Sequence, residues 1–257
     1  MKNIILLDKK EGETPLQALE SFRAKNKEYK DPKDIRMTYA GRLDPMASGL
    51  LLILAGEETK KKEKYLALTK EYDFTVLFGF STDTYDILGK IQHSNILENV
   101  GMSELEKKIK KNLKLFRGKF RQKYPMYSSK TVAGRPLFAY ARAGEEIERP
   151  EREVDVKSLK FIGIKKIDKA ALLRNIEKRI AKVEGDFRQK EILKIWRRGL
   201  KNKKAPNSFY TASFHIKCSS GTYVRSVADG LGARIGVPAL ALSIKRTKIG
   251  KWGKIQL

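Results

Sequence analysis

Cysteine and histidine are almost absent from this sequence. The single cysteine, Cys218, excludes an intrachain disulfide and a metal cluster built on several cysteines. The two histidines, His93 and His215, have no neighbours at the spacing of a metal-binding motif. We therefore expect no metal centre. Cys218 alternates in phase with Phe214 and Ile216, which predicts a small core residue.

Long apolar runs are also missing. The N-terminal apolar run, Ile4 to Leu7, ends in Asp8-Lys9-Lys10 and does not have the form of a secretory signal. The longest run, Leu50 to Ala55, is far shorter than the roughly 20 residues that a membrane-spanning helix needs. We therefore expect a cytoplasmic protein without a membrane segment.

Acidic residues are few for a chain of this length. The 257 residues include 55 Lys and Arg against 30 Asp and Glu, which gives a formal net charge of +25. Clustered cations favour a polyanionic partner, because neutralised phosphates release their condensed counterions. A positive charge that serves only solubility is the alternative. The length allows one large domain or two small ones, with a buried core.

The apolar patterns predict a chain that mixes strands and helices. Ser103 and Glu106 stand at capping-box spacing and are predicted to open a helix that has Leu105 and Ile109 on its apolar face. The other predicted helices cover residues 15–24 and 224–235. The predicted strands cover residues 4–7, 50–54, 71–80, 211–218 and 240–244.

Positive charge is concentrated in the segment 165–204, which has 15 Lys and Arg against 5 Asp and Glu, a net +10. Two apolar stripes at helical spacing lie on either side of Gly185. They are formed by Leu173, Ile176, Ile180 and Val183, and by Ile192, Leu193, Trp196 and Leu200. We predict a basic helical hairpin, at about residues 165–206, inserted between two strands of the main sheet. A solvated insertion whose lysines only face water is the alternative.

One acid stands on a tight loop directly before the longest apolar run. The loop reads Ala40-Gly41-Arg42-Leu43-Asp44-Pro45-Met46-Ala47-Ser48-Gly49. Pro45 disfavours helical geometry at Asp44, and the glycines allow backbone conformations that other residues resist. The pattern predicts a lone carboxylate at the end of a central strand. An ordinary Asp-Pro turn is the alternative.

This loop resembles the nucleophile motif of the pseudouridine synthases, which convert uridine in RNA to its C-linked isomer. Five further segments are similar, in the same order, to motifs of the TruB branch of that family. They are Leu7-Asp8-Lys9-Lys10-Glu11-Gly12, Gly56-Glu57-Glu58-Thr59-Lys60, Ser81-Thr82-Asp83-Thr84-Tyr85-Asp86, Pro125-Met126-Tyr127-Ser128-Ser129-Lys130 with Tyr140-Ala141-Arg142, and Cys218-Ser219-Ser220-Gly221-Thr222-Tyr223-Val224-Arg225. The resemblance implies a mixed α/β fold with a central, mainly antiparallel sheet, in one catalytic domain over residues 1–257.

The resemblance also implies three catalytic residues. Asp44 is the carboxylate that attacks the sugar carbon C1′ or removes the C2′ proton, and the sequence leaves both routes open. Arg225 would orient Asp44 through an ion pair. It stands in the first turn of a predicted helix, where the helix dipole disfavours a cation. Tyr72 would stack on the flipped base. An exposed arginine and a plain core tyrosine are the alternatives for these two positions.

RNA contacts are expected from the resemblance and from the distribution of charge. The residues are Lys9, Tyr39, Arg42, Lys130, Arg142, Arg197 and Arg198. For Lys9, Lys130 and Arg142, a role in local structure is the alternative to a phosphate contact. Tyr39 stands where the family usually has the histidine of a Gly-His pair, which is associated with holding the displaced T-loop bases. Tyr39 must therefore hold these bases by stacking or not at all. The C-terminal PUA domain of the family is not expected in this chain, and the basic hairpin is expected to replace part of its grip on RNA.

The expected activity is isomerisation of uridine 55 in the T-arm of tRNA, by a monomer. No cofactor is expected, because the reaction moves one glycosidic bond without redox chemistry. The nearest rival is an enzyme of the RsuA or RluA branches, which act on ribosomal RNA; Arg42 and Ser48 favour those branches, and the segment from Pro125 to Lys130 does not. A non-catalytic RNA chaperone of the tRNA elbow is a rival of another class, which the combination of Asp44 and Arg225 with Tyr72 argues against.

Overall fold

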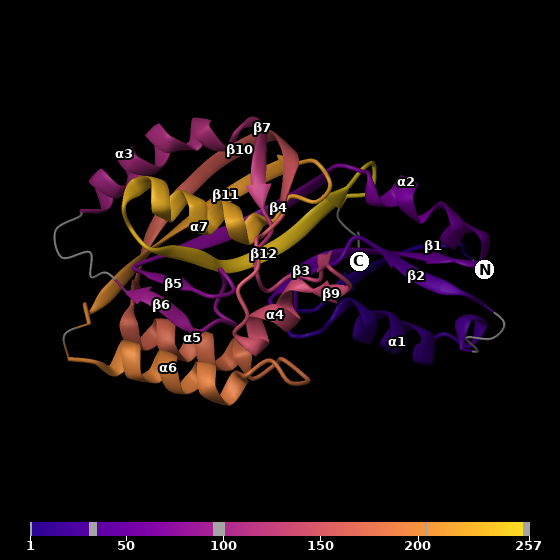
Figure 1. Cartoon of the computed structure of the whole chain (residues 1–257), viewed down its shortest axis with the longest axis horizontal. Helices are drawn as coiled ribbons and strands as arrows, with labels where there is room; N and C mark the ends of the chain where they lie inside the picture. The colour runs from indigo at the N-terminus through magenta and orange to yellow at the C-terminus, as the bar shows by residue number, and fades with distance from the viewer. Residues whose placement is uncertain (1, 31–34, 95–100, 204, 254–257) are drawn as a thin grey trace.

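The computed structural model of the chain describes residues 2–30, 35–94, 101–203 and 205–253. In these ranges an eight-stranded sheet runs through the molecule, with helices on both faces and two small two-stranded sheets beside it (Figure 1). The strands are β1 (Ile4–Lys9), β2 (Met37–Ala40), β3 (Ala47–Ala55), β4 (Lys70–Phe78), β5 (Phe80–Thr82), β6 (Ile91–Ser94), β7 (Gly118–Lys123), β8 (Thr131–Val132), β9 (Arg135–Pro136), β10 (Glu151–Asp168), β11 (Ser208–Cys218) and β12 (Ala239–Ile249). The helices are α1 (Pro15–Lys25), α2 (Lys62–Leu66), α3 (Met102–Asn112), α4 (Leu137–Ala143), α5 (Lys169–Ile180), α6 (Gln189–Lys201) and α7 (Val224–Ile235), with short 3₁₀ helices at Lys27–Tyr29, Gly56–Lys61 and Leu113–Phe116. No helix in the described ranges is both long and apolar enough to cross a membrane.

Antiparallel pairing dominates the central sheet. The strands follow the order β1-β3-β12-β4-β11-β10-β7, and β2 pairs with the part of β3 that β12 does not reach. Among the described strands of this sheet, only β12 and β3 pair in parallel. This arrangement confirms the expected mixed α/β fold with a mainly antiparallel sheet. All but one of the nine residues of β3 are buried, so the strand that follows the Asp44 loop lies in the interior, as predicted.

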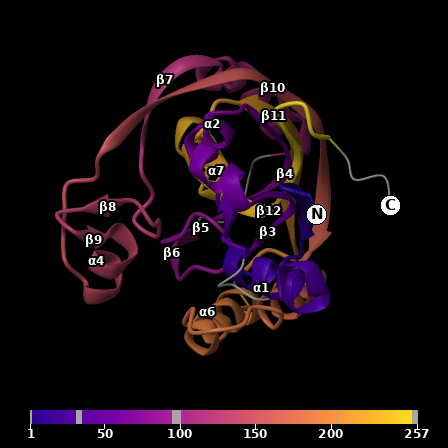
Figure 2. The same cartoon turned by 90° about the vertical axis from the view of Figure 1, so that its right-hand side faces the viewer.

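The two faces of the sheet carry separate cores. In β4, Phe74 and Val76 belong to the cluster that α3 and α7 cover, whereas Leu77 belongs to the cluster that α5 and α6 cover. Neighbouring side chains of this predicted strand thus point to opposite faces of the sheet, and the predicted core residue Cys218 is fully buried in the first cluster. Figure 2 shows the long strand β10 arching over α7, while α6 lies on the other side of the sheet from α7.

The starts of two helices show where local sequence signals succeed and fail. At α1, Gln17 N donates to Thr14 Oγ1 at 3.2 Å and Thr14 N donates to Gln17 Oε1 at 2.7 Å, which makes a complete capping box. The capping box predicted at Ser103 and Glu106 is wrong. Gly101 is the N-cap of α3, because its extended backbone lets its carbonyl accept the N–H of Leu105 at 3.0 Å, and Ser103 lies inside the first turn.

Two helices connect β10 to β11 in the segment predicted to form a basic hairpin. β10 continues to Asp168, which caps α5 by accepting the N–H groups of Ala170 and Ala171. Both predicted apolar stripes face the sheet, and Trp196 is fully buried. The indole N–H of Trp196 donates to the carbonyl oxygen of Ile87 at 3.0 Å. Lys204, at the end of the predicted segment, lies outside the described residues.

Trp196 is the main anchor of the hairpin, and its removal tests that role. We expect Trp196→Ala to lower the free energy of unfolding by about 3–5 kcal/mol, because a large buried side chain and its hydrogen bond are lost together. Urea unfolding followed by circular dichroism measures the change. Lys194→Ala, at an exposed position of the same helix, is the control and should change stability by less than about 0.5 kcal/mol. Equal stability of the two variants would contradict the assignment.

Candidate active site

Asp44 lies in the loop between β2 and β3, with its side chain 39% exposed. The backbone N–H of Ala47 donates to the carbonyl of Asp44 at 3.0 Å and closes the turn. Gly41 and Gly49 have φ angles of +88° and +100°, which L side chains rarely adopt. A Cβ at Gly49 would also lie 2.3 Å from the carbonyl oxygen of Arg246, so glycine is needed for the close approach of β3 to β12.

Arg225 holds the Asp44 carboxylate with two parallel contacts. Its Nε donates to Oδ2 at 2.7 Å, and its Nη2 donates to Oδ1 at 3.1 Å. This bidentate geometry fixes the orientation of a carboxylate as well as its position. The side chain of Arg225 is only 3% exposed, although it stands in the first turn of α7. The alternative of a surface arginine is therefore wrong.

Two further segments complete the surroundings of the Arg225 guanidinium. Its Nη1 donates to the carbonyl of Thr84, in the turn between β5 and β6, and its Nη2 donates to the carbonyl of Tyr127 at 3.2 Å. The carboxylate of Asp86 lies 3.8 Å from its Nε. Burial opposes the positive charge, but the carboxylates of Asp44 and Asp86 outweigh it and raise the pKa of Arg225 above its ordinary value.

Asp86 is a part of the site to which sequence reasoning assigned no role. It is buried, and its Oδ1 accepts both the hydroxyl of Thr84 at 2.7 Å and the N–H of Leu88 at 2.9 Å. Burial raises the pKa of Asp86, against the opposing effect of Arg225. Asp86 belongs to the motif Ser81 to Asp86, which is visible in the sequence. The spacing of the motif does not say whether Asp83 or Asp86 faces Arg225.

Tyr72 lies on β4 directly beside Arg246 of β12 and belongs to the same core cluster as Leu43 and Ala47 of the Asp44 loop. It is 9% exposed, and burial raises the pKa of its hydroxyl. Tyr72 is thus a core tyrosine that also borders the Asp44 loop. Its stacking on a base stays a prediction.

Lys9 requires a correction, because its side chain is fully buried and offers no surface to RNA. Its ammonium donates to the carbonyls of Ala47 at 2.6 Å and Lys10 at 2.8 Å, with that of Pro45 at 3.5 Å. The side chain therefore binds the backbone of the Asp44 loop. Burial lowers the pKa of Lys9 to about 8, against the opposing effect of nearby carboxylates.

Arg246 supports the same loop from the other side and was not singled out from the sequence. It is 1% exposed, and its guanidinium donates to the carbonyls of Leu50 at 2.6 Å, Gly41 at 3.1 Å and Arg42 at 3.3 Å. Two buried cations, Lys9 and Arg246, thus satisfy backbone carbonyls on both sides of Asp44. The loop is held by charge-assisted hydrogen bonds rather than by side-chain packing alone.

The other predicted RNA contacts lie on several different elements of the structure. Arg42 is exposed within the loop itself, and Tyr39 is half-buried on β2 with Lys62 Nζ 5.8 Å from its ring centre. Lys130 is exposed and lies over the ring of Tyr124. The remaining three lie on the hairpin or contact it. Arg142 donates to the carbonyl of Asp186 at 2.7 Å, and Arg197 pairs with Glu177 at 2.6 Å. Arg198 is exposed on α6.

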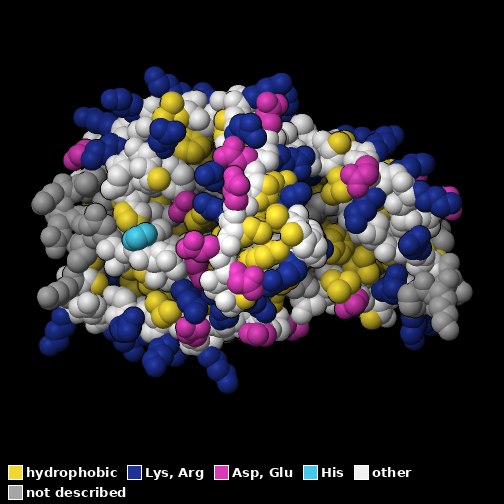
Figure 3. All heavy atoms as spheres, viewed as in Figure 1, with side chains coloured by type: hydrophobic (Ala, Val, Ile, Leu, Met, Phe, Trp, Pro, Cys, Tyr) yellow, Lys and Arg dark blue, Asp and Glu magenta, His cyan; other side chains and the backbone are white. Residues whose placement is uncertain are grey.

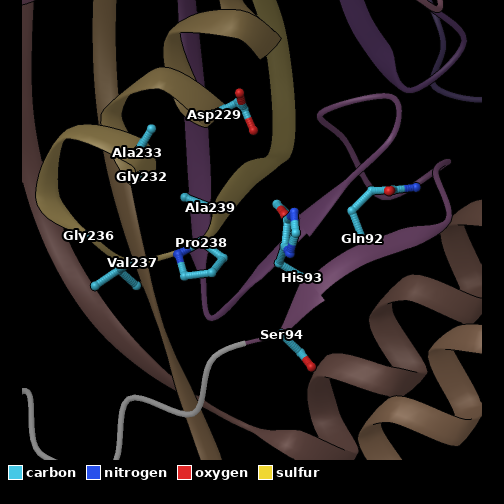
Figure 4. A pocket seen from close by; sticks show the side chains of 11 residues that line it. Gln92, His93, Ser94, Asp229, Gly232, Ala233, Gly236, Val237, Pro238 and Ala239 are labelled. Carbon is cyan, nitrogen blue, oxygen red and sulfur yellow. The ribbon is translucent and has the colours of Figure 1, made fainter.

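A hollow of about 740 Å³ lies away from Asp44, between the end of α7, the turn that follows it, and β6 (Figure 4). Asp229 and His93 line it, and burial raises the pKa of Asp229 to about 6. Neither Asp44 nor Arg225 borders this hollow, so it is separate from the candidate active site. No group of three or more metal-ligating side chains is placed to hold an ion among the residues that the structure describes.

The buried ammonium of Lys9 predicts a pH dependence of stability. Between pH 8 and the ordinary lysine pKa of 10.5, the unfolded chain binds the Lys9 proton more strongly than the folded chain, so this residue makes the fold more stable as pH rises. Relative to Lys9→Met, we expect the parent's free energy of unfolding to increase by about 1 kcal/mol per pH unit in this window. Urea unfolding of both proteins at pH 7.5, 8.5 and 9.5 measures this difference in the free energy of unfolding. A difference that does not change with pH would contradict the prediction. The parent should show no such increase relative to Lys10→Met, because that variant keeps Lys9 and because the hydrogen bond to Asp8 raises the pKa of Lys10.

Comparison with known proteins supports the identity that this site suggests. The model of the N-terminal domain of the TruB family pseudouridylate synthases matches residues 25–177. The tRNA pseudouridine synthase B of Lactobacillus acidophilus is 30% identical over 246 residues, which cover 96% of this chain and 68% of that protein. The tRNA pseudouridine synthase B of Aquifex aeolicus is 30% identical over 250 residues, which cover 97% of this chain and 69% of that protein.

Solved structures show the same fold at lower sequence identity. A chain of a Cbf5-Nop10-Gar1 complex superposes with a TM-score of 0.54 at 17% identity, covering 98% of this chain and 50% of that chain. A chain of an H/ACA RNP bound to a substrate RNA containing 2'-deoxyuridine gives a TM-score of 0.53, also at 17% identity and covering 98% and 49%. The chain thus spans about two thirds of these curated relatives and about half of these solved chains. By its family match over more than half of its residues, and by these relatives, the chain belongs to the TruB family of pseudouridylate synthases, a family of isomerases.

Proposed function

We propose that this chain isomerises a uridine in the T-arm of tRNA, at position 55, with Asp44 as the nucleophile. The observation that carries the proposal is the bidentate contact between Asp44, in the loop before β3, and the buried Arg225 of a TruB-family fold. The relatives from Lactobacillus acidophilus and Aquifex aeolicus are tRNA pseudouridine synthases by name, which supports tRNA as the substrate.

The chemistry fits a single oriented carboxylate. Pseudouridine formation breaks the N1–C1′ bond, turns the base and joins C5 to C1′, so the reacting sugar carbon is the anomeric carbon that carboxylates also attack in glycosidases. The side chain of Asp44 is 39% exposed, whereas that of its partner Arg225 is buried. The carboxylate is therefore accessible to substrate while Arg225 holds its orientation. Because the reaction involves no redox step, we propose that it needs no cofactor. The expectations that the protein is cytoplasmic and a monomer also remain part of the proposal.

A uridine that reacts at C1′ must leave its stack, and an aromatic side chain can receive the flipped base. Tyr72 borders the Asp44 loop within the same core cluster, and we assign it this stacking role. Because Arg42 is exposed two residues before Asp44, we assign it to a phosphate of the flipped nucleotide. Tyr39 remains assigned to the displaced bases of the T-loop.

We assign the contacts with the body of the tRNA to the outer face of α6. Apart from the adjacent pair Arg197 and Arg198, its exposed cations follow one another at intervals of three or four residues and therefore form one stripe. They are Lys190, Lys194, Arg197, Arg198 and Lys201. The 13 residues of the helix span about 20 Å, enough to follow several phosphates of one strand. Lys and Arg side chains project along the lower edge of the molecule where α6 lies, with fewer Asp and Glu side chains among them (Figure 3).

Replacement of the nucleophile is the direct test of the proposal. We expect Asp44→Asn to lower the single-turnover rate by about three orders of magnitude or more, with little change in RNA affinity, because one reacting group is lost among many contacts. Joining C5 to C1′ displaces the C5 hydrogen, so release of tritium from [5-³H]uridine in a T-arm stem-loop measures the rate. Asp229→Asn, a partly buried carboxyl on α7 away from the site, is the control and should keep the parental rate.

The same assay separates the rivals. Preference for a ribosomal RNA fragment over the T-arm would favour the RsuA or RluA branches. Binding of tRNA without tritium release by the parent would favour a chaperone. Turnover by Asp44→Asn above about one tenth of the parental rate would remove Asp44 from the role of nucleophile.

The cationic stripe of α6 gives a second prediction. Reversal of Lys190, Lys194, Arg198 and Lys201 to Glu should weaken tRNA binding and make the slope of log affinity against log salt shallower by about three to four, because each neutralised phosphate contributes about 0.9. The rate at saturating RNA should stay at the parental value. Filter binding at several salt concentrations measures the slope.

The control for this reversal changes the net charge equally on another helix. Lys107, Lys110, Lys111 and Lys114 lie on or just after α3, on the opposite face of the central sheet from α6 (Figure 1). Their reversal to Glu should leave most of the salt slope intact. Equal slopes for the two variants would show that α6 acts through net charge alone and carries no specific RNA contact.

A further inference from the structure

Arg188 occupies an unusual position at the start of α6. Its backbone lies in the left-handed region, with φ 63° and ψ 24°, which costs about 1 kcal/mol or more for a residue other than glycine. Only two other non-glycine residues in the described ranges have a positive φ, and one of them, Tyr85, lies in the turn beside the active site. Such a conformation persists only where the surrounding contacts hold it in place.

The Arg188 side chain makes those contacts with two segments near Asp44. Its Nη1 lies 2.8 Å from Oδ2 of Asp83, and both side chains are less than one fifth exposed. Its guanidinium carbon lies 4.3 Å from the ring centre of Tyr127, within the range of a cation–π interaction. Asp83 and Tyr127 also interact with each other. Burial raises the pKa of Tyr127, and the nearby Asp83 carboxylate raises it further.

Asp83 uses its second oxygen to close the turn between β5 and β6. Its Oδ1 accepts the N–H of Lys90 at 2.8 Å, and its own N–H donates to the carbonyl of Lys90 at 3.1 Å. The carboxylate therefore joins this turn to the helical hairpin. An ion pair with so little exposure is screened less by solvent than one at the surface.

The two segments that Arg188 holds are the ones that deliver acceptors to Arg225. Thr84, next to Asp83, accepts from Nη1 of Arg225 through its carbonyl. Tyr127 accepts from Nη2 through its own carbonyl. The remaining donors of Arg225 hold the two oxygens of Asp44. Arg188 is thus connected to the Asp44 carboxylate along two short paths that meet at one guanidinium.

We propose that Arg188 is a positioning residue of the active site, which keeps the Thr84 and Tyr127 carbonyls in place so that Arg225 presents Asp44 in its bidentate geometry. This proposal rests on the proposed function of Asp44. It gives the α5–α6 hairpin a second role, because the same helix that offers cations to RNA on its outer face anchors the catalytic carboxylate at its first turn. Arginine suits the position because its planar guanidinium binds a carboxylate and covers an aromatic ring at once.

The test is the single-turnover rate at saturating RNA, measured beside RNA affinity and the midpoint of thermal unfolding. We expect Arg188→Gln to lower the rate by about 10- to 100-fold, because a small displacement of a catalytic group costs this much, and to leave affinity and the unfolding midpoint near the parental values. Arg188→Lys, which keeps the charge, should recover part of the rate. A structural role alone would change the unfolding midpoint and leave the rate of the folded fraction unchanged.

Arg135 offers a matched control. Its guanidinium also pairs with a carboxylate, Glu145 at 2.9 Å, and also lies 4.3 Å from a tyrosine ring, that of Tyr140. Neither partner contacts Arg225 in the described structure. Arg135→Gln should therefore keep the parental rate at saturating RNA. An equal loss in Arg135→Gln and Arg188→Gln would overturn the proposal.

A double-mutant cycle with Asp83→Asn tests the path. Asparagine keeps a side-chain oxygen for the N–H of Lys90 but removes the charge that binds Arg188. We expect Asp83→Asn to lower the rate in the same range as Arg188→Gln, and the double variant to be no slower than the slower single one. Independent, multiplying losses, or a parental rate in Arg188→Gln, would overturn the proposal. If Arg188→Gln does not fold, Arg188→Lys and Asp83→Asn decide the question by the same rate criterion.

The parental enzyme separates this proposal from the proposed function. If the parent releases tritium from the T-arm, the variants are compared on that RNA. If it acts instead on another RNA, the proposed substrate is wrong, and the comparison on that RNA still decides the role of Arg188. If it isomerises no uridine in total RNA, both proposals fail together.

Discussion

The buried guanidinium of Arg225 is the interaction on which the rest of the site depends. A charge with 3% exposure is costly unless its donors are satisfied, and here the acceptors come from the Asp44 loop, the turn between β5 and β6, and the segment after β7. These segments are distant in the sequence, so the folded arrangement of α7, β3 and β4 must bring them together. Loss of any one acceptor would leave a buried donor unpaired, which ties the orientation of Asp44 to all of them.

The Asp44 loop is constrained separately by backbone contacts. Lys9 and Arg246 are buried cations that bind the carbonyls of the loop and of the start of β3. Gly49 allows β12 to approach so closely that a Cβ would lie within 2.3 Å of a carbonyl oxygen. A carboxylate that must meet one sugar carbon gains from such rigidity, because little conformational entropy is left to lose when substrate binds.

The helical hairpin joins this site to the surface of the molecule. One stripe of α6, centred on the fully buried Trp196, packs against α5 and the small β5–β6 sheet, and the opposite stripe is cationic and exposed. Its first turn reaches Asp83 and Tyr127 through Arg188, while Arg142 of α4 bonds the carbonyl of Asp186 in the adjoining turn. The two helices therefore contact the segments around Asp44 as well as extending the basic surface.

The sequence by itself determined the elements whose signals are local. The alternation of β4, the apolar stripes of the hairpin and the Pro and Gly positions around Asp44 all follow from periodicity and backbone restriction, and motif resemblance marked Asp44 and Arg225. Tertiary structure decided which charges are buried. It turned Lys9 from an expected RNA contact into a support of the loop, and gave roles to Arg246 and Asp86 that no local pattern carries. The reason is distance along the chain: Arg225 lies 181 residues from Asp44, and Arg188 lies 105 residues from Asp83, so only the packed fold determines which acceptors a cation meets and how much water remains around it.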